Sequence, residues 1–191
     1  MKNIKPRLFV FSAPSGSGKT TIVKDVLKNY PDFVFSISAT TRTKRLTEIE
    51  GVDYFFVNEI EFQSKINNDE FIEWEKVYDY YYGTLKSQID DNIEKGLNTV
   101  FEVDVVGAFK IKRYYSNSTL IFISPPGIEE LKERLIKRNT ETNEDLRMRI
   151  ERAEMELSVK NKFDYIVSNI DLEEAKKTVK QIIDNEITKE V

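Results

Sequence analysis

The sequence predicts an α/β fold, in which a parallel sheet is covered by helices on both faces. Short apolar runs of strand length alternate along the chain with segments of helical periodicity, as in successive strand–helix–strand units. Strands of such a sheet are buried on both faces, so they appear as continuous apolar runs. Between residues 39 and 82 the texture changes to short aromatic strands, which predicts a small mixed α/β subdomain inserted into the sheet.

The first elements of the core lie near the amino terminus. The apolar run Leu8–Ser12 predicts a buried strand, and a helical pattern follows over about residues 19–29. Pro31 ends this helix, because proline cannot continue it. Residues 33–38 carry apolar side chains at alternate positions, which predicts a second strand.

The inserted region contains its own strands and helix. Residues 54–57 and 71–74 are short aromatic strands, and a short helix is expected near residues 59–66. A tyrosine-rich tract at residues 78–83 closes the region. We therefore expect a mixed α/β unit that interrupts the core.

The strand and helix pattern of the core then resumes. A helix is expected over about residues 84–95, with Gly96 as the residue that follows its last turn. The remaining elements are a strand at 99–104, a strand at 120–123, a helix at 128–137, a polar break at 139–143, a helix at about 144–160, a strand at 164–168 and a helix at 172–187. The predicted parts are a core at about 1–38, 84–137 and 153–191, the insertion at about 39–83 and a helical lid at about 138–152.

Composition excludes several classes of site and partner. The 191 residues include no cysteine and no histidine, which excludes disulfides and leaves a zinc site without its usual ligands. The lack of cysteine fits a cytoplasmic protein. A net charge of −4 lacks the basic surplus of a duplex-binding protein, so no nucleic-acid partner is expected. No apolar run approaches the ~18 residues of a membrane span, so no membrane partner is expected either.

A glycine-rich turn between the first strand and the first helix has the pattern of a phosphate-binding loop. Gly16 and Gly18 allow positive φ, and the following helix turns its positive end toward an anion. Lys19 can reach nucleotide phosphates, and Thr20 can ligate Mg²⁺. Ala13 stands where the strict pattern has glycine. A chance strand–turn–helix connection is the alternative, although it would rarely add Lys-Thr-Thr. The predicted phosphate-binding residues are Ala13, Pro14, Ser15, Gly16, Ser17, Gly18, Lys19, Thr20 and Thr21.

A second set of phosphate-binding side chains follows the second strand. Residues 36–45 place Arg42 and Arg45 in a loop that is rich in hydroxyl groups. The guanidinium fork suits phosphate oxygens, and hydroxyls add further donors. A solvated basic loop is the alternative, but beside a phosphate-binding turn a second phosphate site is the better interpretation.

Several separated motifs together resemble the guanylate kinase family. They occur in the family's order and cover nearly the whole chain. They are Ser-x-Ser-x-Thr-Thr-Arg-x-x-Arg at 36–45, Gly51-x-Asp53-Tyr54-x-Phe56, the run from Glu70 to Trp74, Tyr81-Tyr82-Gly83, Glu102-Val103-Asp104, and the arginines from Arg134 to Arg149. The resemblance implies transfer of the γ-phosphoryl group of ATP to GMP with Mg²⁺, on a P-loop core with a GMP-binding insertion and a lid.

The resemblance also implies roles for the acceptor residues. A carboxylate at Glu73 can accept from both N1–H and N2–H₂ of guanine, whereas adenine would leave it unpaired. The alternative for Glu73 is an exposed strand carboxylate beside Trp74. Glu102 departs from the family, which often has aspartate there. The implied GMP-phosphate residues are Arg42, Arg45, Tyr54 and Tyr82, and those around guanine are Ser38, Glu73, Thr84 and Glu102.

The resemblance also implies which residues take part in catalysis. Asp104 would orient Mg²⁺ through water, and its alternative role is to cap the following helix. Arg138 and Arg149 resemble lid arginines that contact ATP and the transferring group; Lys19 and Arg42 complete the implied catalytic set. The alternative for these arginines, and for Arg134 and Arg152, is a salt-bridged helix surface.

One further residue is assigned to the ATP site, and two other functions are alternatives. Asn169 matches a position near the adenine of ATP. A kinase for another nucleoside monophosphate is the first rival, and Glu73 with nearby hydroxyls argues against it. A catalytically inactive, phosphopeptide-binding module of the same family is the second, and the intact Lys19-Thr20 pair argues against that. The expected partners are ATP and GMP, while use of dGMP and the oligomeric state stay open.

Overall fold

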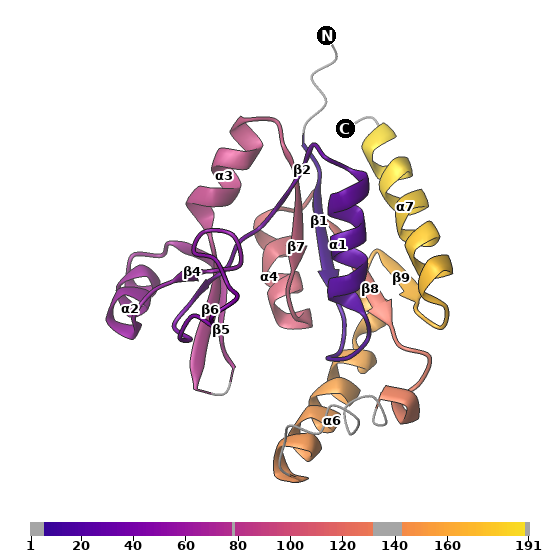
Figure 1. Ribbon diagram of the computed structural model, residues 1–191. Helices are drawn as coiled ribbons and strands as arrows, with labels where there is room; N and C mark the ends of the chain where they lie inside the picture. The colour runs from indigo at the N-terminus through magenta and orange to yellow at the C-terminus, as the bar shows by residue number, and fades with distance from the viewer. Residues whose placement is uncertain (1–5, 78, 132–142, 190–191) are drawn as a thin grey trace.

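The core of the protein is a five-stranded sheet with strand order β2-β7-β1-β8-β9, in which all neighbouring strands are parallel (Figure 1). It is seen in a computed structural model that describes residues 6–77, 79–131 and 143–189. The predicted α/β class is confirmed. The strands are β1 (Leu8–Ser12), β2 (Phe33–Phe35), β7 (Asn98–Glu102), β8 (Thr119–Ser124) and β9 (Tyr165–Ser168).

Helices cover both faces of this sheet, as the continuous apolar strands predict. Along β1, Phe9 and Phe11 belong to one buried cluster, whereas Leu8 and Val10 belong to the other. The first cluster is completed by α1 (Lys19–Asn29) and α7 (Leu172–Thr188). The second is completed by α3 (Lys86–Glu94) and α4 (Val105–Tyr114) on the opposite face.

The insertion has a sheet of its own, with strand order β4-β3-β6-β5 (Figure 1). Its own core is small, because among the described residues of the insertion the buried members of this cluster are Ala39, Phe62 and Phe71. Phe62 stacks on Phe71 with ring centroids 4.5 Å apart and on Tyr81 at 5.4 Å. We use "the insertion" for β3 (Ala39–Thr40), β4 (Phe55–Phe56), α2 (Glu59–Asn67), β5 (Phe71–Val77) and β6 (Tyr80–Leu85).

Two predicted boundaries around the insertion are wrong. The tyrosine-rich tract continues as strand β6, so α3 begins at Lys86 rather than near Thr84. Pairing with β5 decides this, since Gly83 lies against Phe71 and a Cβ there would be 2.8 Å from the ring. The second strand ends at Phe35, because the amide of Ile37 turns to the side chain of Gln88 at 3.1 Å.

The carboxyl-terminal third contains α6 (Asn143–Ser158), which lies apart from the sheet and beneath it in Figure 1. Leu131 and Ala153, the latter on α6, are buried in one small cluster. The predicted helix at 128–137 and the predicted lid at 138–152 fall partly outside the described residues. Within the described ranges, no helix is long and apolar enough to cross a membrane.

Candidate active site

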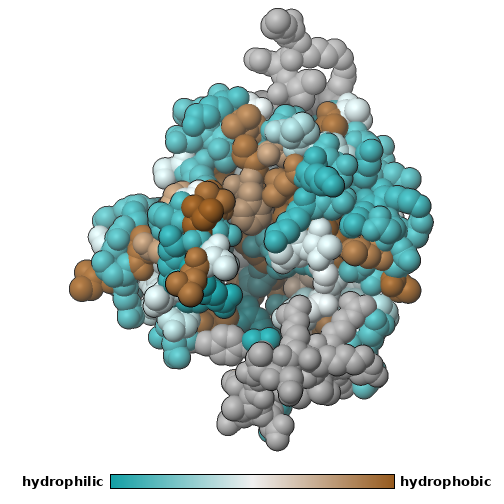
Figure 2. Space-filling model, viewed as in Figure 1, coloured by the Kyte–Doolittle hydropathy of each residue, from teal (hydrophilic) through white to brown (hydrophobic). Residues whose placement is uncertain are grey.

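Two adjoining cavities open at the carboxyl ends of the core strands, between the core, the insertion and α6. The first has a volume of about 400 Å³ and the second about 600 Å³. Figure 2 shows the surface hollowed between the insertion and the core. The two cavities form one continuous site, because they share six lining residues: Lys19, Thr20, Val77, Glu102, Asp104 and Arg152.

The glycine-rich turn forms the wall of the first cavity. Gly16 and Gly18 both take positive φ, at 87° and 86°, as the motif requires. α1 begins directly after Gly18, so its first N–H groups point toward the cavity. The buried hydroxyl of Ser17 has no hydrogen-bond partner among the described residues. All nine predicted phosphate-binding residues, 13–21, line this cavity, so the structure brings them together at the start of a helix, where backbone N–H groups favour an anion.

Asn169 supports the turn from behind. Its side-chain amide donates to the carbonyl of Ser17 at 2.7 Å, and its backbone amide donates to Ser124 at 2.8 Å. A Cβ at Gly18 would lie 2.4 Å from the Asn169 amide nitrogen, so only glycine fits there. Asn169 is not among the residues that line the first cavity. It holds the loop in shape, and its predicted contact with ATP stays a prediction.

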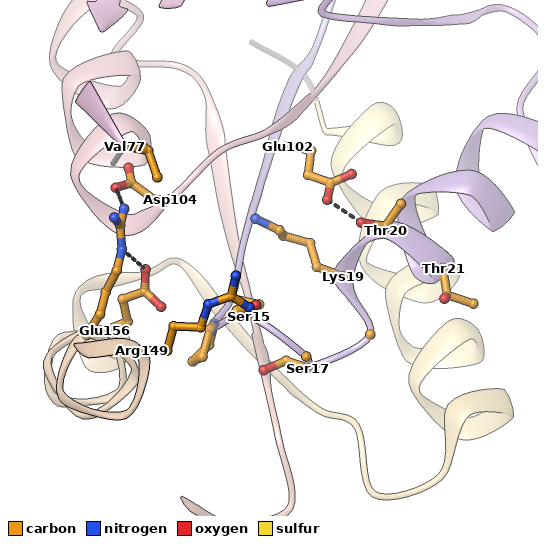
Figure 3. A pocket seen from close by; sticks show the side chains of 15 residues that line it. Ser15, Ser17, Lys19, Thr20, Thr21, Val77, Glu102, Asp104, Arg149 and Glu156 are labelled. Carbon is orange, nitrogen blue, oxygen red and sulfur yellow. Dashed lines mark hydrogen bonds and ion pairs between the residues drawn. The ribbon is translucent and has the colours of Figure 1, made fainter. Parts of the chain in front are cut away.

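Lys19 lies where the two cavities meet. Its ammonium donates to the carbonyl of Val103 at 2.9 Å. Burial lowers the pKa of Lys19, and the carboxylates of Glu102, Glu156 and Asp104 oppose that shift. Figure 3 shows its side chain between the Thr20–Glu102 pair and Asp104. The Lys19 side chain thus lines both cavities at their boundary.

Two carboxylates from the end of β7 have different partners. Glu102 accepts a hydrogen bond from the hydroxyl of Thr20 at 2.5 Å (Figure 3). Asp104 accepts from the backbone amide of Gly107 at 2.7 Å and so caps α4, which confirms its alternative role. Glu102, assigned to guanine from the sequence, therefore also faces the metal-binding candidate Thr20.

Glu73 is a buried acid that lines the second cavity. It is only 8% exposed, so the alternative of an exposed strand carboxylate is wrong. Its carboxylate accepts from the hydroxyl of Thr84 at 2.6 Å. Burial raises the pKa of Glu73, and this hydrogen bond opposes the shift. A Cβ at Gly107 would lie 3.1 Å from a Glu73 oxygen, so the close approach of α4 depends on that glycine.

The predicted phosphate-binding arginines of the insertion lie in different surroundings. Arg42 donates to both carboxylate oxygens of Glu48, at 2.6 and 3.1 Å, and its guanidinium lies 5.3 Å from the ring centre of Tyr54. The Arg42 guanidinium holds the pKa of Glu48 below its usual range. Arg45 is exposed, although its backbone amide also donates to Glu48 at 2.8 Å. Neither arginine lines the second cavity in this structure.

Five of the predicted acceptor residues do line the second cavity. Tyr54 and Tyr82 meet edge to face, with ring centroids 6.0 Å apart. Thr84 lies behind Glu73 and is fully buried. The five are Ser38, Tyr54, Glu73, Tyr82 and Glu102.

Some residues that line the cavities were not predicted from the sequence. Glu75, Val77 and Glu156 line the cavities, although no motif points to them. Arg152 also lines both cavities, and it pairs with Glu156, four residues along α6. Its pairing with Glu75 spans 77 positions, so no local sequence signal could reveal it.

Of the two predicted lid arginines, the structure describes one. Arg149 lines the first cavity and is drawn on α6 in Figure 3. Arg138 lies outside the described residues.

Comparison with known proteins gives one consistent result. The guanylate kinase family model matches residues 5–186. A guanylate kinase of Thermotoga maritima is 45% identical over 186 residues, covering 97% of this chain and 90% of the relative. One from Bacteroides thetaiotaomicron is 47% identical over 192 residues, covering 100% and 94%. The crystal structure of the Anaplasma phagocytophilum guanylate kinase aligns with TM-score 0.76 and 31% identity, covering 98% of this chain and 89% of that chain. The chain belongs to the guanylate kinase family.

Proposed function

We propose that this chain transfers the γ-phosphoryl group of ATP to GMP, producing ADP and GDP. The observation that carries the proposal is the pair of adjoining cavities that share Lys19 at their boundary. One cavity is a phosphate-binding loop at a helix start, and the other ends at a buried carboxylate. Two nucleotides bound in this way would meet at their phosphates, as phosphoryl transfer requires.

The acceptor base is recognised through Glu73. Its buried carboxylate offers acceptors to N1–H and N2–H₂ of guanine, and Thr84 holds it in place at 2.6 Å. Adenine presents an acceptor at N1 and lacks the 2-amino group, so it would leave this buried acid unpaired. Sites of this kind discriminate by roughly 10⁴-fold or more. Ser38 and Glu102 border the same cavity and complete the set of side chains assigned to guanine.

The phosphates are held by separate groups. The turn at residues 13–21 receives ATP, and Asn169, which supports this turn, is assigned to the adenine. Tyr54 and Tyr82 lie in the second cavity, where the GMP phosphate would bind. Arg42 and Arg45 join them when the phosphate replaces Glu48 as their partner. Arg138 and Arg149 are assigned to the ATP phosphates and the transferring group.

Mg²⁺ fits the donor set at the boundary of the cavities. Hydroxyl and carboxylate oxygens are its preferred ligands, and Thr20, Glu102 and Asp104 supply them. We assign Thr20 as a ligand and Asp104 as an indirect one through water. Within the described residues no group of three or more His, Cys, Asp or Glu side chains could hold a metal ion. Mg²⁺ is usually bound by one or two carboxylates together with substrate phosphates. Bound Mg²⁺ would neutralise charge on the phosphate oxygens.

The chain's own residues contribute position and charge. Lys19 and the arginines offset the charge that accumulates around the transferring group, so no strong general base is needed, and the chain has no histidine to serve as one. The predicted insertion at about 39–83 binds GMP, and the predicted lid at about 138–152 excludes water from the reaction. A cytoplasmic location, expected from the composition, is part of the same proposal.

A coupled assay of ADP formation with each nucleoside monophosphate tests this function. GMP should be turned over, with dGMP measured beside it, and AMP, dTMP and UMP should be poor substrates. Preferential turnover of AMP would contradict the role given to Glu73. Binding of a phosphopeptide without any ADP formation would favour the inactive-module alternative.

A further inference from the structure

Arg152 on α6 lies between three carboxylates that come from different parts of the molecule. Its Nη2 donates to both oxygens of Glu75 on β5, at 3.2 and 3.1 Å, and to Asp104 at 2.7 Å. Its Nε donates to Glu156, four residues along α6, at 3.3 Å. The guanidinium therefore joins the insertion, the carboxyl end of β7 and α6. Figure 3 draws the dashed contacts of Asp104 and Glu156 on this side of the first cavity.

Strand β5 connects this ion pair to the base-recognition site. Alternate residues of a strand share one face, so Glu73, Glu75 and Val77 face the same way. All three line the second cavity, and Val77 lines the first as well. The residue that pairs with α6 is therefore two positions from the acid assigned to guanine.

Helix α6 connects the same ion pair to the ATP side. Arg149 and Arg152 are three residues apart, so they share one helix face, and both line the first cavity. A helix moves as a rigid element over this length. A shift of α6 relative to β5 would therefore move Arg149 relative to the bound phosphates.

Exposure indicates what kind of effect the pair has. Arg152 and Glu75 each retain 35% side-chain exposure, and ion pairs so accessible to water contribute little to overall stability. Glu75 and Asp104 also lie within hydrogen-bond reach of each other, and the guanidinium bonds to both acids. The effect of the pair is then on where β5 and α6 lie relative to one another.

We propose that the Arg152–Glu75 ion pair is a tether that couples binding of GMP to binding of ATP. It does so by fixing the strand that carries Glu73 to the helix that carries Arg149. The inference rests on the proposed function, because it needs both nucleotide sites. Arg152 and Glu75 are positioning residues, which act through Arg149 and Glu73 without contacting a nucleotide.

Calorimetry tests the coupling. The affinity for GMP is measured with and without a saturating non-hydrolysable ATP analogue, in the unmodified chain, Glu75→Gln, Arg152→Met and the double variant. The ATP analogue should strengthen GMP binding about fivefold or more in the unmodified chain, within the range of typical couplings. Each single variant should lose that factor, and the double variant should lose no more. Arg147→Met removes an exposed arginine of the same helix, paired only locally with Glu151 among the contacts described, and should leave coupling unchanged.

Three calorimetric results would overturn the tether. They are absence of coupling in the unmodified chain, retained coupling in both single variants, and losses that add in the double variant. A kcat loss of about 100-fold in Arg152→Met alone, with Glu75→Gln unaffected, would instead place Arg152 on the phosphoryl group and also overturn it. If Arg152→Met does not fold, Glu75→Gln carries the same test. Failure of the proposed function would be seen separately, as no ADP formed by the unmodified chain from ATP and GMP.

The distance between two spin labels tests the tether without a measurement of catalysis. The chain has no cysteine, so Ile60→Cys on α2 and Glu154→Cys on α6, both exposed positions, accept two spin labels specifically. Without nucleotide, the distribution of label distances should broaden when Glu75→Gln is added. It should stay unchanged when Arg147→Met is added. An unchanged distribution in Glu75→Gln would contradict the tether.

Discussion

The loop that lines the first cavity and the insertion that borders the second are built in opposite ways. The loop takes its residues from one continuous stretch, 13–21, and its shape depends on two glycines and a helix start. The second cavity takes side chains from α1, β2, the insertion and the end of β7, which are far apart in the sequence. A local site forms as soon as its turn forms, whereas a dispersed site needs the tertiary fold first.

The two regions also rest on cores of different size. Ala13, at the start of the loop, belongs to a buried cluster that spans the main sheet and two helices. In the part of the insertion that the structure describes, its own cluster has three buried residues, Ala39, Phe62 and Phe71. Binding of ATP should therefore tolerate substitutions in the insertion, whereas binding of GMP should not.

The largest effect should come from Lys19→Met, which removes the charge shared by both cavities. We expect kcat to fall on the order of 10⁴-fold, comparable to loss of other cations that stabilise phosphoryl transfer. GMP affinity should change little, because the ammonium lies at the boundary and bonds to Val103. Steady-state kinetics and calorimetry check this, with Lys28→Met at an exposed position of α1 as the control. Loss of GMP binding alone would contradict the two-site arrangement.

The next effect should come from Phe62→Ala, which empties the small core of the insertion. Truncation of a fully buried phenylalanine costs about 3–5 kcal/mol. The insertion should lose hydrogen-exchange protection and GMP binding, while the ATP analogue still binds. Phe62→Leu, which keeps most of the volume, should retain both. Equal loss of the two ligands would show that the regions are not independent.

A smaller effect should come from Glu73→Gln, which keeps the shape of the acceptor site. The glutamine amide can no longer accept from both guanine donors, so kcat/KM for GMP should fall about 100-fold, or about 2.7 kcal/mol. Preference for GMP over IMP, which lacks the 2-amino group, should shrink. Glu61→Gln on the exposed face of α2 is the matched control. Unchanged preference would remove Glu73 from base recognition.

The smallest effect should be the pH dependence of stability. Because burial raises the pKa of Glu73, the folded chain binds this proton more tightly than the unfolded chain. The free energy of unfolding should therefore fall as pH rises from the usual glutamate range, near 4.3, through the raised pKa. Glutamine does not titrate, so the Glu73→Gln variant lacks this fall in the free energy of unfolding. Its stability relative to the unmodified chain should therefore increase as pH rises through that range. Urea unfolding at a series of pH values checks the sign, and the opposite slope would contradict it.

Much of the core could be predicted from local patterns. The strand Leu8–Ser12 and the helix Lys19–Asn29 have the predicted bounds, because an apolar run, two glycines and Pro31 define them locally. Gly96 has φ of 71° just after α3, as expected of a residue that ends a helix. These signals act over a few residues, so the sequence alone contains them.

Other elements depended on partners far along the chain. β6 could not be separated from the start of α3, because its pairing with β5 overrides the local helical pattern. The helix α4 was not assigned a range, although Asp104 was recognised as its possible cap. Two features of the site could also not be predicted from the sequence. They are the burial of Glu73 beside Gly107 and the pairing of Arg152 with Glu75.

By itself, the sequence determined the α/β class, the phosphate-binding turn and the residue types needed for two nucleotides. These depend on composition, periodicity and motifs of adjacent residues, where the physical interactions are local. Only the tertiary structure decided that Glu102 pairs with Thr20, that Glu73 is buried, and that Arg152 bridges β5 and α6. Such contacts join segments separated by tens of residues, so they exist only after the sheets and helices have packed.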